Sequence, residues 1–137
     1  MDDAMRQFQR AIAIDPKYAK AHNNLGVVLM RANQLNQAAA EFRVALAADR
    51  RNVESLVNLA LVQRSLGHVA DARELLRRAL TIDPRSAGTH YNLALVADEN
   101  GDTPTAIEHY RAFLRLGSVT HADLAVQVRA RLTALGG

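Results

Sequence analysis

Three asparagines recur at equal intervals along this sequence, and their side chains suit recognition of a peptide backbone. Asn24, Asn58 and Asn92 are about 34 residues apart, and a leucine follows each of them. A primary amide both donates and accepts hydrogen bonds. A column of amides at a regular interval can therefore pair with successive peptide groups of an extended ligand, whatever side chains that ligand carries.

Residue types that bind metals or catalyse reactions are present, but their spacing favours neither role. The sequence has no cysteine, and no two of its histidines have the short helical spacing of a zinc site: His22, His68, His90, His109 and His121. The glycines form no phosphate-binding loop, and no serine or carboxylate pair has a base placed beside it. We therefore expect no metal, no cofactor and no catalytic residue.

The asparagine interval is the period of a longer internal repeat. Further columns of small, bulky and leucine residues keep the same step: Ala38, Ala72 and Ala106; Phe42, Leu76 and Tyr110; Leu46, Leu80 and Leu114. Within each unit the apolar residues follow helical spacing twice. We expect an all-α fold with helices at about 19–31, 35–48, 53–65, 69–82, 87–99 and 103–116.

The repeat columns also predict how the helices pack. Small residues on the first helix of each unit (Gly26, Ala60 and Ala94) should face the alanine column of the second helix, so that the two backbones approach closely. The bulky column should fill the gap against the next unit. Phe113 replaces the alanine found at Ala45 and Ala79, so we expect the last interface to be repacked around it.

Local signals mark the ends of the helices. Asn33, Gly67 and Gly101 fall where a first helix ends, and these residue types tolerate a left-handed backbone. Thr103 is the expected N-cap of a helix with Pro104 in its first turn. Arg50 replaces the proline seen at Pro16 and Pro84, so the helix before it is expected to run on.

The two ends of the array differ. Residues 122–135 are amphipathic and read as a capping helix, with Leu124, Val128 and Leu132 covering the last unit while Asp123, Gln127, Arg129 and Arg131 face water. Residues 2–14 match only the second helix of a unit, and their apolar stripe lacks its own first helix. Self-association through this stripe is therefore one hypothesis.

Together these columns resemble the tetratricopeptide repeat over residues 1 to about 117, and the last helix resembles the family's C-terminal cap. The resemblance implies a right-handed superhelix whose concave surface is lined by first helices and binds segments of partner proteins. It divides the chain into a second helix of an incomplete repeat (1–18), three repeats (19–52, 53–86 and 87–118) and a capping helix (119–137).

The resemblance also places the residues of the concave groove. Those expected to contact a peptide are Lys20, Asn23, Asn24, Val27, Arg31, Glu54, Val57, Asn58, Leu61, Tyr91, Asn92, Leu95 and Glu99. The asparagine column looks like the ladder of the superhelical members, such as O-linked glucosaminyl transferases. Two interpretations stay open: contact with the ligand, or hydrogen bonds to a neighbouring helix.

The groove also has a predicted charge pattern. It runs from Lys20 and Arg31 at one end to Asp98 and Glu99 at the other, which can orient a ligand of mixed charge. The carboxylate clamp of chaperone-binding members has almost no counterpart, because the residues at its positions supply almost none of its positive charge: Asn23, Val27, Glu54 and Gly88. An acidic chaperone tail is therefore not the expected ligand.

Charge and hydropathy limit the classes of partner that we expect this chain to bind. The formal net charge is +3, but the best basic column (Arg43, Arg77 and Arg111) is interleaved with Glu74 and Glu108, so we expect a solvated face and no nucleic-acid binding. No apolar run approaches a membrane span, and no signal peptide is visible. We expect a cytoplasmic peptide-binding adaptor, or alternatively a self-assembly module or a non-catalytic segment of a larger enzyme or secretion component.

Overall fold

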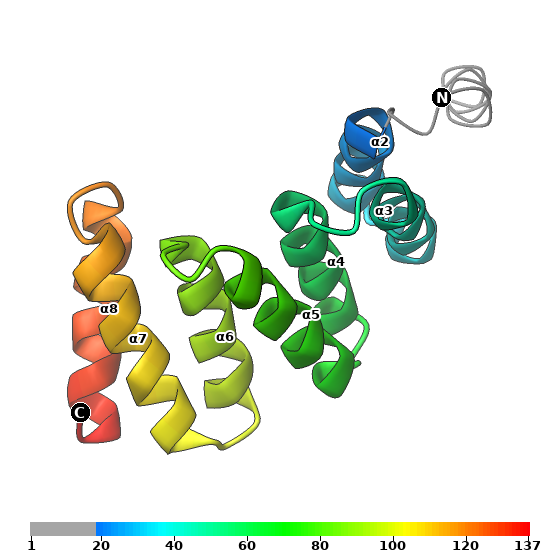
Figure 1. The fold of residues 1–137 in the computed structure, drawn as a ribbon. Helices are drawn as coiled ribbons and strands as arrows, with labels where there is room; N and C mark the ends of the chain where they lie inside the picture. Colours follow the sequence, from blue (N-terminus) through cyan, green and yellow to red (C-terminus); the bar gives the residue numbers. More distant parts are fainter. Residues whose placement is uncertain (1–18) are drawn as a thin grey trace. The chain divides into compact units, whose positions relative to one another are not determined.

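The computed structural model describes residues 19–137, which form seven α-helices and no strand (Figure 1). The helices are α2 (Ala19–Arg31), α3 (Leu35–Ala48), α4 (Val53–Ser65), α5 (Val69–Ile82), α6 (Ala87–Glu99), α7 (Thr103–Gly117) and α8 (Ala122–Leu135). Six of these were predicted from the repeat pattern and α8 from its amphipathic sequence, and only α7 differs, ending one residue later than expected. The predicted helix at residues 2–14 lies outside the described residues.

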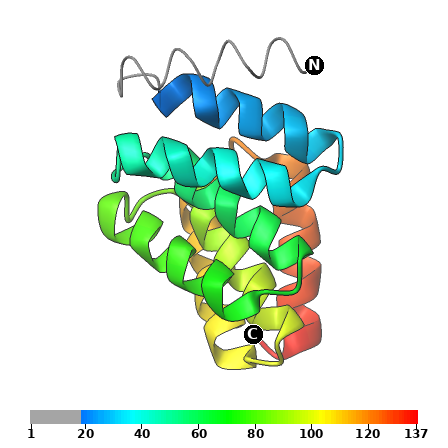
Figure 2. The same ribbon diagram turned by 90° about the vertical axis from the view of Figure 1, so that its right-hand side faces the viewer.

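The described chain consists of two compact units whose boundary lies within α5, between Leu75 and Leu76. In the first unit α2 packs antiparallel against α3, and α3 contacts α4 (Figure 2). In the second unit α6 packs against α7, and α7 contacts α8 (Figure 1). Among residues 19–137, no helix is both long enough and apolar enough to cross a membrane.

One turn geometry joins the two helices of every repeat. Asn33, Gly67 and Gly101 have φ values of 61°, 84° and 77°, as the sequence predicted. The residue after each of them donates its amide to a carbonyl five residues earlier, as in the bond of 2.8 Å from Gln34 to Leu29. This is the Schellman motif, which satisfies helix carbonyls that would otherwise lack a partner.

The turn between repeats is set by an aspartate, which corrects the expectation for Arg50. α3 ends at Ala48 and does not run on. The Asp49 carboxylate accepts the amide of Arg51 at 3.1 Å, and Asp83 accepts that of Arg85 at 3.3 Å. Because both turns have this bond, the helix stops with or without the proline.

The next helix in each case begins at a side-chain cap. Asn52 and Ser86 accept the amides of Ser55 and Thr89 at 3.0 and 3.3 Å. The prediction that Thr103 caps α7 was wrong by one residue. Asp102 is the N-cap, and its carboxylate accepts the Thr105 amide at 3.4 Å. A carboxylate at this place also interacts favourably with the positive end of the helix dipole.

The core of the first unit depends on a close approach between Gly26 and Phe42. Phe42 on α3 is fully buried, and a Cβ placed on Gly26 of α2 would lie 2.5 to 2.8 Å from three atoms of its ring. The bulky residue thus fills space within its own helix pair, beside the small residue of the first helix. Glycine at this position leaves room for the ring.

The second unit is packed around Phe113, as expected from its replacement of alanine. Phe113 is fully buried, and its ring centroid lies 5.5 Å from that of Tyr91 and 6.0 Å from that of His121. The surrounding core includes residues of α6, α7 and α8: Ala94, Ala97, Ala106, Tyr110, Ala125, Val128 and Leu132. The prediction that Val128 and Leu132 cover the last repeat is confirmed.

Candidate peptide-binding surface

In the first unit, one residue of the predicted groove is buried in a hydrogen-bond network. Asn23 is 3% exposed, and its side-chain oxygen accepts hydrogen bonds from Ser55 Oγ at 3.0 Å and from Asn58 Nδ2 at 3.2 Å. Its Nδ2 donates to Glu54 Oε2 at 3.5 Å. Asn23 thus links α2 to α4, and this network accounts for one of the two amide protons of Asn58.

The neighbouring asparagine is placed differently. Asn24 is exposed on α2, as are Lys20 and Arg31, while Val27 is half-buried. On α4, Glu54 is exposed and Val57, Asn58 and Leu61 are half-buried. The members of the asparagine column therefore differ. Asn24 presents its amide to solvent, whereas the Asn58 amide donates a hydrogen bond to Asn23 of the neighbouring helix α2.

In the second unit, predicted groove residues line a cleft of about 240 Å³. Tyr91 and Leu95 of α6 form one side, and Val128 of α8 forms another. The cleft also contains Asp98, Tyr110, Gln127 and Arg131. Asn92 is half-buried and Glu99 exposed on the same helix α6, outside this cleft.

A hydrogen-bonded ion pair lies in the cleft. Arg131 donates to the two carboxylate oxygens of Asp98 at 2.7 and 2.6 Å, and the Tyr110 hydroxyl donates to the same carboxylate at 2.9 Å. The Arg131 hydrogen bonds hold the pKa of Asp98 below its ordinary value, against the opposing effect of burial. Burial, and then the bond to Asp98, raises the pKa of Tyr110 above its ordinary value. Tyr110 therefore remains a neutral donor.

Four residues of this cleft were not assigned to the groove from the sequence: Tyr110 of α7 and Gln127, Val128 and Arg131 of α8. Gln127 and Arg131 are exposed on α8, as expected of a capping helix, but they also line the cleft opposite Tyr91 and Leu95. The available signal was their spacing of one helical turn together with the acidic Asp98 in the preceding repeat. Because Arg131 offsets the charge of Asp98, the predicted acidic end of the groove is weaker than the sequence suggested.

Within residues 19–137, no cluster contains three or more histidine, aspartate or glutamate side chains placed to hold one ion. The described histidines instead make pairwise contacts: His22 Nδ1 with Glu41, His68 Nδ1 with Gln63 Oε1 at 3.0 Å, and His90 Nδ1 with His109 Nδ1 at 3.0 Å.

Comparison with solved structures identifies the fold. The chaperone SycD of Yersinia enterocolitica, solved with a peptide of the translocator YopD, superimposes with a TM-score of 0.82 at 13% identity, covering 88% of this chain and 93% of SycD. PcrH, known from Pseudomonas aeruginosa and solved with the chaperone-binding region of PopD, gives 0.81 at 19% identity over 88% and 92% of the two chains. MamA gives 0.77 at 20% identity over 98% and 85%.

Sequence comparison identifies the family. No curated protein sequence matches the chain. A family model described as "Tetratricopeptide repeat" matches residues 57–119, and one described as "TPR repeat" matches residues 1–33. The two matches together span most of the sequence, and the helix pairs, turns and structural neighbours agree with them. The chain therefore belongs to the tetratricopeptide-repeat family, with the all-α solenoid fold of that family.

Proposed function

We propose that this protein is a non-catalytic adaptor that binds a peptide segment of a partner protein along the first helices of its repeats. The observation that carries the proposal is the cleft beside Tyr91 and Leu95, two residues that the sequence had already assigned to the peptide. Peptide complexes of the structural neighbours SycD and PcrH support the same role.

The chemistry of the cleft suits a peptide side chain followed by a polar group. Tyr91, Leu95 and Val128 offer an aromatic and aliphatic lining for an apolar side chain. Arg131 has five N–H donors and uses two of them on Asp98, so others remain for a ligand carbonyl or carboxylate. Gln127, one turn earlier on α8, adds an amide that can pair with a peptide group.

In the first unit the proposal assigns ligand contact to the exposed side chains of α2. Asn24 is the amide available to a peptide backbone, with Lys20 and Arg31 nearby in sequence on the same helix and Val27 between them. Asn23 is assigned a structural role because its oxygen already accepts two hydrogen bonds inside the unit. Of the three asparagines in the column, Asn24 and Asn92 therefore remain as candidates for contact with the ligand.

The test is a selection from a random-peptide library displayed on phage, followed by affinity measurements with the selected peptides. Leu95→Glu places a charge in the apolar lining, and Val119→Glu is the matched control because Val119 is 93% exposed and outside the cleft. We expect Leu95→Glu to weaken binding by at least about tenfold, the effect of losing a well-packed apolar contact. If the selected peptides bind wild type and Leu95→Glu with equal affinity, the proposal that they bind in this cleft is refuted.

The self-assembly hypothesis rests on residues 2–14, which lie outside the described residues. It predicts a mass that increases with concentration in light scattering. Membership of a longer enzyme or secretion component is compatible with the adaptor role, since a peptide-binding array serves equally well as one part of a larger protein.

A further inference from the structure

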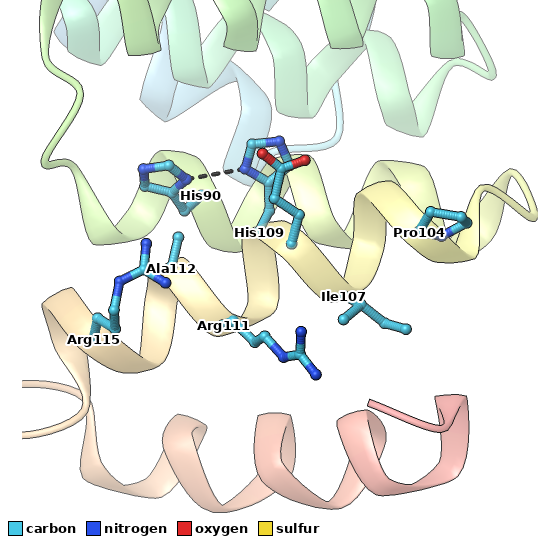
Figure 3. Close-up of a pocket in the computed structure, with 8 residues that line it drawn as sticks. His90, Pro104, Ile107, His109, Arg111, Ala112 and Arg115 are labelled. Atoms are coloured by element: carbon cyan, nitrogen blue, oxygen red, sulfur yellow. Dashed lines mark hydrogen bonds between the residues drawn. The ribbon is translucent and has the colours of Figure 1, made fainter.

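Two histidines from facing helices of the last repeat meet at their ring nitrogens. His90 on α6 and His109 on α7 are 19 residues apart in sequence, and their Nδ1 atoms are 3.0 Å apart (Figure 3). The ring centroids are separated by 5.2 Å. A separation of 19 residues is far outside the short helical spacing, so the spacing of the histidines in the sequence does not indicate this pair.

The hydrogen-bond partner of His90 fixes which nitrogen carries the proton. His90 Nε2 lies 2.9 Å from the carbonyl oxygen of Pro84. A carbonyl only accepts, so Nε2 must be the N–H, and in the neutral ring Nδ1 then has a free lone pair. That lone pair points toward Nδ1 of His109, which donates its proton in the metal-free pair.

This arrangement matches the usual support of a metal-binding histidine. Such a histidine donates its second ring N–H to a carbonyl or carboxylate, which orients the ring and raises the basicity of the ligating nitrogen. The Pro84 carbonyl already performs this role for His90. Imidazole nitrogen is a common ligand of Zn²⁺, Ni²⁺ and Cu²⁺.

Space for an ion and its waters is available at the pair. His90 and His109 line a pocket of about 370 Å³ together with Glu108, Arg111 and Arg115, among others (Figure 3). Arg111 donates to the Gly137 carbonyl at 3.1 Å. The two arginines oppose a cation and Glu108 favours one, so we expect modest affinity.

The other repeats show that the fold does not need a polar pair at these positions. The equivalent residues of the middle repeat are Leu56 and Leu75, and both are buried. The equivalent residues of the first described repeat are His22 and Glu41, whose side chains are joined by a buried hydrogen bond. A histidine pair is thus a property of the last repeat alone within the described chain.

The geometry points to a divalent transition-metal site in which Nδ1 of His90 and Nδ1 of His109 are adjacent ligands. With metal–nitrogen bonds of about 2.1 Å, nitrogens 3.0 Å apart subtend an angle of about 90° at the ion. This angle belongs to square-planar or octahedral coordination and favours Ni²⁺ or Cu²⁺ over tetrahedral Zn²⁺. Water fills the other positions, and His109 takes the tautomer protonated on Nε2.

The test is calorimetric titration of the untagged protein with Ni²⁺, using variants that the repeats themselves suggest. We expect about one Ni²⁺ per chain and at least about tenfold weaker binding by His109→Asn. The double variant His90→Leu and His109→Leu copies the middle repeat, so it should fold and lose the site. His68→Gln changes an exposed histidine elsewhere and should bind as wild type does.

A second measurement does not depend on any variant. Paramagnetic Ni²⁺ should broaden the NMR ring signals of His90 and His109 in the wild type before those of His68 and His121. Absence of binding at millimolar Ni²⁺, equal binding by the double leucine variant, or broadening that begins at another histidine would each overturn the proposal.

Discussion

Arg131 on α8 donates two hydrogen bonds, of 2.7 and 2.6 Å, to the carboxylate of Asp98 on α6. These residues are 33 positions apart, and the bonds fix the terminal helix against the first helix of the last repeat. The Tyr110 hydroxyl donates to the same carboxylate, so α6, α7 and α8 all contribute to one polar cluster. The cap is therefore also a wall of the candidate peptide cleft.

We predict that this cluster makes stability sensitive to acid. The pKa of Asp98 is lower in the folded protein than its ordinary value of 3.8, chiefly because of the Arg131 hydrogen bonds. The stabilisation is thus complete above the unfolded pKa and is lost as pH falls through the folded pKa. At pH 7 Asp98→Asn should lower Tm by about 1–4 °C, since Arg131 is exposed and solvent screens its ion pair with Asp98. Below about pH 4 the difference from wild type should shrink. Thermal melts from pH 2 to 7 measure this, and a constant difference would contradict it.

Gly26 should not tolerate a methyl group. Gly26→Ala places a Cβ within 2.8 Å of the buried Phe42 ring, and overpacking of this kind costs about 1–3 kcal/mol of unfolding free energy. Gly88→Ala is the matched control, because a Cβ there meets no atom within 4 Å and alanine favours a helix. Urea denaturation should show opposite signs for the two variants. Equal stability of Gly26→Ala and wild type would show that the ring adjusts freely.

The two adjacent asparagines of α2 should respond differently to alanine. Asn23→Ala removes the acceptor of Ser55 Oγ, a fully buried hydroxyl, and should cost about 1–3 kcal/mol. Asn24→Ala changes an exposed side chain and should alter stability by less than about 0.5 kcal/mol. If Asn24 contacts a peptide, its variant loses affinity while its urea midpoint stays that of wild type. Similar destabilisation by both variants would contradict the assigned roles.

The corrected cap of α7 gives a local prediction. Asp102→Ala leaves the Thr105 amide without its side-chain acceptor and should cost about 1 kcal/mol. Thr103→Ala, one residue later, should have a smaller effect because Asp102 is the N-cap. Chemical denaturation of the two single variants checks the order. A larger loss of stability from Thr103→Ala than from Asp102→Ala would show that Thr103 is the N-cap.

The helices could be predicted because local chemistry sets their ends. Asn33, Gly67 and Gly101 adopt the left-handed backbone that their residue types permit, and the repeat period places them in register. The errors at Arg50 and Thr103 have the same cause. In both turns an aspartate side chain bonds a backbone amide, and such a bond depends on a rotamer that residue type alone does not fix.

The candidate site was less predictable because its contacts join residues far apart in sequence. Asn23 and Asn24 are adjacent and alike, yet only Asn23 meets Ser55 and Asn58 across the helix pair. Helical periodicity assigns a residue to a face of the helix. It does not decide whether a residue between the buried and the exposed face, such as Asn23, is buried. The metal-ligand spacing rule likewise covers pairs on one helix and omits pairs such as His90 and His109.

The local hydrogen bonds that close the turns allow whole repeats to be gained or lost in evolution. The bend inside each repeat and the bend between Asp49 and Asn52 or Asp83 and Ser86 are each closed by bonds among residues of the bend and of the preceding helix. A gene duplication or deletion of one whole period therefore carries its own start and stop signals, and no helix needs a new terminus. The number of repeats can then vary by recombination, independently of the substitutions that change single residues on their surfaces.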